Sequence, residues 1–165
     1  MNPWLRLRAI TDLRSPGEVL VLGCCLFACA CGSTLMNQRV ESRAKDWTLT
    51  VREVSDGPNS ISFHNMNHVP ADDGRFLHVF VTLRNDAQQK RSWNWPRCGL
   101  DHGNEEMLPS IIMYDMIVNS PADEVAELDP GEAIERRVIF TYPEKGSLPT
   151  RLKCGELVIP LKLSQ

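Results

Sequence analysis

Two histidines four positions apart, His64 and His68, have a residue type and spacing from which metal sites are built. An i, i+4 pair of imidazoles meets on one ion only when both side chains project from the same face of a helix. The segment His64-Asn65-Met66-Asn67-His68 instead has the composition of a loop or of a strand end. The sequence therefore predicts no metal, and it leaves His64 and His68 as the nearest approach to a pair of metal ligands.

A short aromatic and basic segment, Trp93-Asn94-Trp95-Pro96-Arg97, contains the residue types that dominate binding hot spots. Trp93 and Trp95 are two residues apart, so both indole rings lie on one face of an extended strand. One interpretation makes Trp93, Trp95 and Arg97 the contact residues for a partner. The other places this face in the hydrophobic core, as aromatic side chains pack in β-sandwiches. Pro96 indicates an interruption, because proline inside a strand is typical of an edge or a bulge.

The sequence lacks the motifs of nucleophilic catalysis and of calcium binding. It contains no Gly-x-Ser-x-Gly elbow, and the acidic residues between Asp123 and Asp129 do not have EF-hand spacing. The chain has 18 basic and 21 acidic residues, a net charge of −3, and no basic stripe. This charge pattern argues against nucleic acid as a partner. We therefore expect a protein that is not an enzyme and that binds no cofactor.

The N-terminal part of the chain has the organisation of a secretory signal. Three arginines precede an uncharged apolar run that begins at Val19 and continues through four cysteines. Within this run, Leu26-Phe27-Ala28-Cys29 is similar to a bacterial lipobox, in which the cysteine receives the lipid. We predict a signal peptide over 1–28 and lipidation of Cys29, with Cys31 as the alternative acceptor. Two other interpretations stay open: the same run is an uncleaved membrane anchor, or it holds a cytosolic cysteine cluster.

The number of cysteines predicts one disulfide in the exported part. Of the six cysteines, four lie in the leader, so cleavage leaves Cys98 and Cys154 as the remaining pair. An even pair in an exported domain indicates a bridge, and two unpaired buried thiols are the alternative. The leader and the disulfide together predict a membrane-anchored lipoprotein of the cell envelope, facing the periplasm or the exterior.

Turn signals and alternating strands indicate an all-β fold. Residues 32–45 are polar and lack apolar periodicity, so we expect the lipidated cysteine and a flexible tether over 29–45. One domain then follows over 46–165. Arg75–Arg84 is the strongest strand, and its two largely apolar faces predict a central place in a sheet. About seven strands separated by short turns predict a β-sandwich or a small barrel, and Pro121–Leu128 is the best helical candidate.

Three segments carry a resemblance to a known family. They are Gly74–Asn85, with a glycine, a long strand and a terminal asparagine; Leu100–Asn104, a hairpin turn; and Leu128–Pro143, a proline-glycine turn with a strand and a closing proline. In order and spacing they resemble the telokin-like, immunoglobulin-like domain of unknown function that recurs in bacterial lipoproteins and secreted antigens. The resemblance covers Trp47–Leu163 and implies an immunoglobulin-like β-sandwich that acts as a non-enzymatic module. Trp93–Cys98 departs from the family pattern.

These observations together predict a lipid-anchored extracytoplasmic binding or structural module without catalytic activity. Its lipid would attach it to the membrane, and its partner would be a protein of the envelope. The alternative is an envelope-assembly accessory protein that docks through an exposed sheet edge. A metal-binding or enzymatic envelope protein is the third interpretation.

Overall fold

The computed structural model describes residues 32–164, apart from 58–59, 64–65, 71–73, 104, 115–116, 144 and 146. Cys29, Cys31 and His64 lie outside the described residues, so the lipidation sites and the histidine pair stay predictions.

The described residues form strands and one turn of 3₁₀ helix, with no α-helix, as the all-β prediction requires. The elements are β1 (Thr34–Met36), β2 (Val40–Ala44), β3 (Trp47–Asp56), β4 (Ile61–Phe63), β5 (Met66–His68), β6 (Gly74–Asn85), β7 (Arg91–Asn94), η1 (Trp95–Arg97), β8 (Cys98–His102), β9 (Glu105–Met107), β10 (Pro109–Tyr114), β11 (Ile117–Asn119), β12 (Val125–Leu128), β13 (Ala133–Pro143), β14 (Arg151–Cys154) and β15 (Leu157–Pro160).

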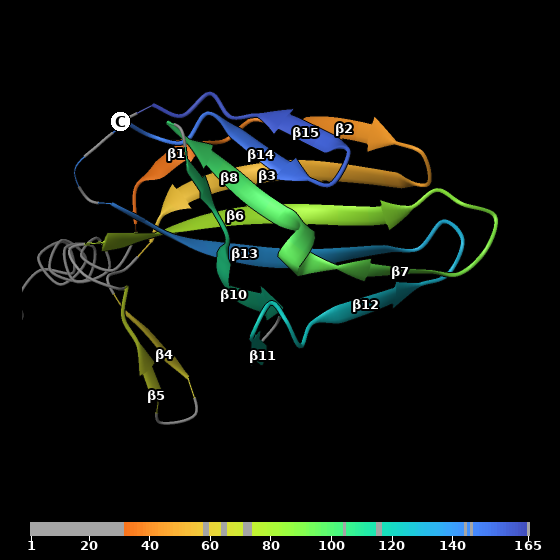
Figure 1. Cartoon of the computed structure of the whole chain (residues 1–165), viewed down its shortest axis with the longest axis horizontal. Helices are drawn as coiled ribbons and strands as arrows, with labels where there is room; N and C mark the ends of the chain where they lie inside the picture. The colour runs from red at the N-terminus through yellow and green to blue at the C-terminus, as the bar shows by residue number, and fades with distance from the viewer. Residues whose placement is uncertain are drawn as a thin grey trace, which may run out of the picture. The chain divides into compact units, whose positions relative to one another are not determined.

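Strand β6 lies at the centre of a seven-stranded antiparallel sheet, as the sequence predicts (Figure 1). The strand order is β1-β3-β6-β13-β10-β11, and β2 also pairs with β3. Alternate side chains of β6 face the main core, where Leu77, Val79, Val81 and Leu83 are fully buried. Phe76 on the opposite face is buried as well. A strand with two apolar faces is stable only when other residues bury both faces, and a strand at the centre of a sheet is buried in this way.

A second layer closes the main core and makes the fold a β-sandwich. It consists of a four-stranded sheet of order β15-β14-β8-β9 and a two-stranded ribbon of β12 and β7. Side chains from both layers are buried together, for example Leu49 and Val138 from the large sheet with Leu100 and Leu152 from the small one. Each sheet is hydrophobic on the face that it turns to the other, which is how two sheets form one core.

The segment expected to be a flexible tether, 29–45, contributes two strands, and that expectation is wrong for the part that the structure describes. β1 and β2 both pair with β3 and form one interrupted edge of the large sheet. Leu35 and Met36 are buried in the main core. The polar residues between the buried ones conceal this pattern, because the outward face of an edge strand is mostly polar. Gly32–Gln165 forms one compact unit, so the domain begins before residue 46.

The helix considered for Pro121–Leu128 is also wrong, since this segment forms a turn followed by strand β12. β12 pairs with β7 along its whole length. Its side chains alternate in exposure, and Ala126 and Leu128 are buried in the main core. Alanine and glutamate favour helix, but the energy of pairing and of burial outweighs a weak local propensity.

A second, smaller apolar cluster lies on the outer face of the large sheet, the face turned away from the main core. Its buried members are Ile61, Phe76, Ile111 and Ile139. His78 lies on the same face of β6 and is 5% exposed, and its Nε2 has no hydrogen-bond partner among the described residues. Burial, helped by the charge of Arg137, lowers the pKa of His78 from 6.5 to about 4, and Asp56 opposes this shift in part. His78 is therefore neutral at pH 7.

This buried neutral imidazole predicts a loss of about 3 kcal/mol of stability between pH 6.5 and pH 4. In that window the unfolded chain binds a proton on His78 that the folded protein does not, so stability falls as the pH falls. Thermal unfolding of the wild-type protein and of His78→Gln from pH 4 to 7 tests this, because other groups titrate equally in both. The stability difference between them should change by about 3 kcal/mol. A difference that is constant with pH would contradict the prediction.

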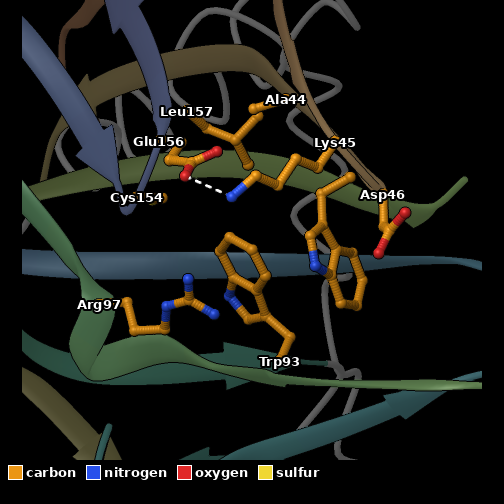
Figure 2. A pocket seen from close by; sticks show the side chains of 9 residues that line it. Ala44, Lys45, Asp46, Trp93, Arg97, Cys154, Glu156 and Leu157 are labelled. Carbon is orange, nitrogen blue, oxygen red and sulfur yellow. Dashed lines mark hydrogen bonds and ion pairs between the residues drawn. The ribbon is translucent and has the colours of Figure 1, made fainter. Parts of the chain in front are cut away.

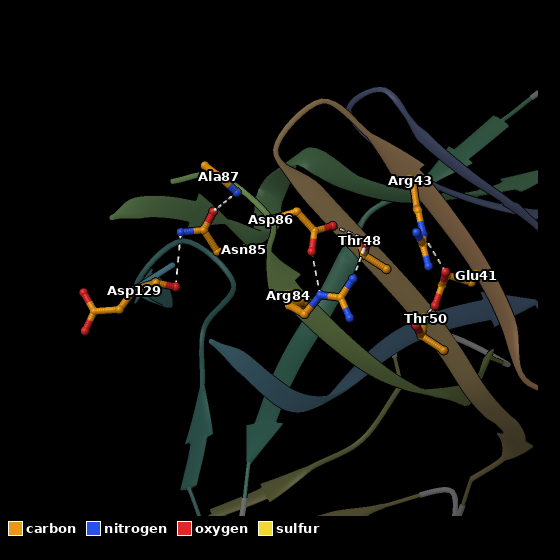
Figure 3. Close-up of polar contacts among 9 residues, drawn as sticks. All are labelled: Glu41, Arg43, Thr48, Thr50, Arg84, Asn85, Asp86, Ala87 and Asp129. Carbon is orange, nitrogen blue, oxygen red and sulfur yellow. Dashed lines mark hydrogen bonds and ion pairs between the residues drawn. The ribbon is translucent and has the colours of Figure 1, made fainter. Parts of the chain in front are cut away.

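Asn85, the last residue of β6, joins the end of that strand to the turn between β12 and β13 (Figure 3). Its buried Nδ2 donates to the backbone oxygens of Gln89 and Leu128 at 2.9 Å each, and its Oδ1 accepts from the N–H of Ala87 at 2.9 Å. The N–H of Gly131 in the turn donates to the carbonyl oxygen of Asn85 at 2.8 Å. Gly131 has a φ of 78°, a conformation that favours glycine.

We expect Asn85→Ala to lower the free energy of unfolding by about 2–3 kcal/mol, because it leaves several buried backbone groups without a partner. Denaturant unfolding monitored by circular dichroism measures the change. The matched control is Lys90→Ala in the loop that follows, which removes an exposed ion pair with Glu127 and should cost about 0.5 kcal/mol. Equal losses in the two variants would show that the buried amide does not stabilise this turn.

Candidate functional site

One 3₁₀ turn follows Trp93 and begins with Trp95, and both tryptophans of the aromatic segment are buried. η1 lies between β7 and β8, so the chain is interrupted at Pro96 as the sequence predicts. The rings of Trp93 and Trp95 are 6.0 Å apart in an edge-to-face arrangement, and both residues are at most 1% exposed. Of the three candidate contact residues, the structure therefore places Trp93 and Trp95 in the core and leaves Arg97 exposed.

The predicted disulfide between Cys98 and Cys154 is present. The two cysteines are directly opposite each other in the register of β8 and β14, and their Cα atoms are 3.9 Å apart. Both residues are buried in the main core. The bridge fastens β8, just after η1, to the C-terminal part of the chain.

Two hairpin turns meet beside this disulfide. Lys45 and Asp46 connect β2 to β3, and Gly155 and Glu156 connect β14 to β15. Lys45 Nζ lies 2.7 Å from Glu156 Oε1, so an ion pair joins the two turns (Figure 2). Gly155 has a φ of 64°, as two-residue hairpin turns require.

These turns and η1 enclose a small pocket of about 130 Å³. Its wall includes the indoles of Trp47 and Trp93, whose centroids are 5.1 Å apart. The guanidinium of Arg97 lies beside Trp93 in Figure 2, with its Cζ 5.3 Å from the ring centroid. The lining residues are Ala44, Lys45, Asp46, Trp47, Trp93, Arg97, Cys154, Glu156 and Leu157.

The charged residues at the pocket rim differ in whether they have an ion-pair partner. Lys45 is paired with Glu156, and Asp46 is paired with Arg91 at 2.9 Å. No carboxylate among the described residues lies within ion-pair distance of Arg97, so its guanidinium offers free donors at the rim. The pocket can therefore accept a carboxylate-sized group between Arg97 and Lys45, with an aromatic wall behind it.

The backbone of Lys45 is unusual for its residue type. Its φ is 49°, and it is the only non-glycine residue with a positive φ among those that the structure describes. This conformation costs a lysine roughly 1 kcal/mol relative to glycine. The two-residue turn between β2 and β3 requires this positive φ.

The histidine pair gives no site in the described part of the chain. His68 ends β5 and is half-buried, while its predicted companion His64 lies outside the described residues. Among the described residues there is no group of three or more histidine, cysteine, aspartate or glutamate side chains that could hold a metal ion.

Sequence reasoning found Arg97 and the disulfide, but it missed three residues that complete the pocket: Trp47, Lys45 and Glu156. Trp47 has a signal, because it begins an alternating strand and is a large aromatic residue near a turn. The other two have none, because only the folded chain brings the two hairpin turns together.

Comparisons with known proteins find two solved structures of low sequence identity. No protein-family model matches the chain, and a search of curated proteins finds no match. An uncharacterized β-sandwich protein from Clostridium difficile 630 is similar over 72% of this chain and 82% of its own, with 11% identity and a TM-score of 0.47. A functionally unknown protein from Listeria monocytogenes EGD-e is similar over 70% of this chain and 69% of its own, with 13% identity and a TM-score of 0.45.

In the part of the chain that the structure describes, no helix is long and apolar enough to cross a membrane.

Proposed function

We propose that this protein is a lipid-anchored, extracytoplasmic module of the immunoglobulin-like type, which works by binding a protein partner rather than by catalysis. The observation that carries the proposal is the pocket between the two hairpin turns. It combines an aromatic wall with the guanidinium of Arg97, which has no carboxylate partner in the described part of the chain. Aromatic and arginine side chains are the residue types that contribute most to protein interfaces.

The compartment is supported by the apolar leader and by the Cys98–Cys154 bridge. Disulfides persist in oxidising compartments and are rare in the cytosol. A cysteine-linked diacylglycerol with an additional acyl chain on Cys29 would hold the protein durably, since stable anchoring takes more than one chain.

The fold places a limit on how far the domain can extend from its anchor. The carbonyl oxygen of Ser33 accepts a hydrogen bond from the N–H of Asp56 at 2.8 Å, so the folded domain already begins there. Four residue steps separate Cys29 from Ser33, which span at most about 14 Å. A lipidated domain would therefore work at the membrane surface, where its partner must also be found.

Lipidation is tested by substituting the two candidate cysteines separately. We expect Cys29→Ser to abolish labelling by an alkyne-bearing fatty acid, and Cys31→Ser to leave it unchanged. Mass spectrometry of the mature N-terminus identifies the acceptor independently. Labelling lost only in Cys31→Ser would move the site by two residues, and labelling in both variants with an uncleaved N-terminus would favour the membrane anchor.

Binding at the pocket is tested by site-specific photo-crosslinking in intact cells. A benzoylphenylalanine residue at Lys45 should yield a discrete adduct, whereas the same residue at Arg43, two positions earlier on the exposed surface of β2, should not. Arg97→Glu should remove the Lys45 adduct if the partner presents a carboxylate. An adduct that forms equally at both positions would contradict a partner site at this pocket.

The alternative, docking through a sheet edge, is favoured by one observation. β11 is the outermost strand on one side of the large sheet, and Ile117 in it is 42% exposed. An apolar edge strand is a template for a strand from another chain. If Ile117→Lys prevents partner capture while Arg97→Glu does not, the edge and not the pocket is the binding site.

A further inference from the structure

A second hollow lies against the large sheet, apart from the pocket described above. It has a volume of about 450 Å³, within the range of small-molecule sites. We call it the arginine hollow, and its lining residues are Arg52, Phe80, Met113, Tyr114, Glu135, Arg136 and Arg137.

The register of the sheet brings these residues together. Arg137 of β13 is directly opposite Phe80 of β6 on one side and Met113 of β10 on the other, so all three share the outer face. A β-bulge between Val51 and Glu53 redirects β3 at Arg52. Bulges change the direction in which a strand presents its side chains.

Two of the three arginines are already paired. Arg52 Nη1 lies 2.6 Å from Glu135 Oε1 at the surface. Arg136 Nε lies 2.9 Å from Glu124 Oε1 in a pair that is largely buried, and its guanidinium covers the Tyr114 ring at 4.0 Å. These contacts fix both guanidinium groups in place.

Arg137 is different, because no carboxylate of the described residues lies within ion-pair distance of it. Its guanidinium is held over the Phe80 ring, with Cζ 4.7 Å from the centroid. It is half-buried, and its positive charge contributes to the lowered pKa of the neighbouring His78. The hollow therefore contains a partly desolvated cation that no charge of the described fold neutralises.

The rest of the hollow is apolar. Met113 packs against the small outer cluster, and Phe80 and Tyr114 present half-buried rings. Cationic and apolar surfaces lie side by side, and complementarity requires a ligand with both an anionic group and an apolar body. A planar guanidinium matches a carboxylate bidentately.

We propose that the arginine hollow binds a small organic anion whose carboxylate pairs with Arg137 and whose flat apolar body lies against Phe80 and Met113. This site does not depend on the proposed partner pocket, because Arg137, Phe80 and Met113 come from β13, β6 and β10, and none of these strands lines that pocket. The ligand replaces the counter-charge that the described residues do not provide. Salt weakens this binding, because the pair is partly open to solvent.

The test uses 2-naphthoate as the probe and 2-naphthamide as its neutral isostere, titrated into the folded domain. We expect saturable binding of naphthoate with a dissociation constant of about 1 mM, roughly tenfold tighter than that of the amide. The methyl signal of Met113 and the ring signals of Tyr114 in NMR spectra should shift during the titration, which locates the ligand.

Variants separate the charge from the apolar body. Arg137→Gln should lower the affinity for naphthoate about tenfold and leave the amide unchanged, and Arg137→Lys should restore part of the loss. Phe80→Leu should weaken both probes. The matched control is Arg43→Gln, an exposed arginine on β2, which should change neither.

Three results would overturn the proposal. The first is naphthoate binding no tighter than that of the amide up to about 20 mM, which rules out charge recognition. The second is an Arg137→Gln variant that stays folded by circular dichroism and binds naphthoate as well as the wild type does. The third is NMR shifts at Trp93 instead of Met113, which would place the anion in the other pocket.

Discussion

Replacing Trp95 by alanine is expected to destabilise the domain by about 3–5 kcal/mol, because the substitution empties a fully buried volume of the core. Trp95 packs edge-to-face with Trp93, whose ring packs in turn on Trp47. Loss of this ring removes contacts between the two layers of the sandwich. The melting temperature should fall by roughly 10–20 °C.

Arg97→Ala is the matched control, because it lies two residues later in the same turn but its side chain is exposed. It should cost less than about 1 kcal/mol, the range of an exposed cation–π contact. Trp95→Phe should fall between the two, since it keeps an aromatic ring in the core. An unchanged melting temperature in Trp95→Ala, together with loss of partner capture, would show that Trp95 contacts a partner instead of stabilising the core.

The central strands could be predicted from the sequence because their signal is local. Residues 75–84 alternate apolar side chains on both faces, and the structure places Leu77, Val79, Val81 and Leu83 in the main core. Turn chemistry was equally informative, since Asn85 ends β6 and Gly131 has the positive φ that a turn there requires.

The errors occurred where a partner strand decides the structure. β1 and β2 are short and mixed in polarity, and they become strands because β3 offers its edge. β12 contains good helix formers, yet its pairing with β7 buries Ala126 and Leu128. In both cases tertiary pairing outweighs local propensity, and no local pattern contains that information.

The pocket was only half predictable for the same reason. Arg97 and the disulfide stand out by residue type, but Lys45 and Glu156 are ordinary charged residues, 111 positions apart. Their meeting depends on two hairpin turns at the ends of separate sheets. The arginine hollow has no sequence signature either, because Phe80, Met113 and Arg137 come from three strands that are neighbours only in the folded sheet.

Removal of the disulfide is expected to cost about 4 kcal/mol, because the bridge joins residues 56 positions apart and restricts the unfolded chain accordingly. The double variant Cys98→Ala/Cys154→Ala tests this by denaturant unfolding against the oxidised wild type. Reductant should lower the stability of the wild type toward that of the variant and leave the variant unchanged. Two free thiols in a non-reducing peptide map of the wild type would contradict the premise.

The same variant should also loosen the partner pocket. The bridge and a hydrogen bond from the N–H of Gly155 to the carbonyl oxygen of Arg97, 3.1 Å long, hold η1 against the β14–β15 turn. Without the bridge the pairing of β8 with β14, the hydrogen bond and the packing remain, so the position of Arg97 relative to Lys45 becomes less tightly fixed. We therefore expect the photo-crosslink at Lys45 to weaken in the double variant even at temperatures where the domain stays folded. A full-strength crosslink there would mean that strand pairing and the packing of Trp93 and Trp95 position the pocket without the bridge.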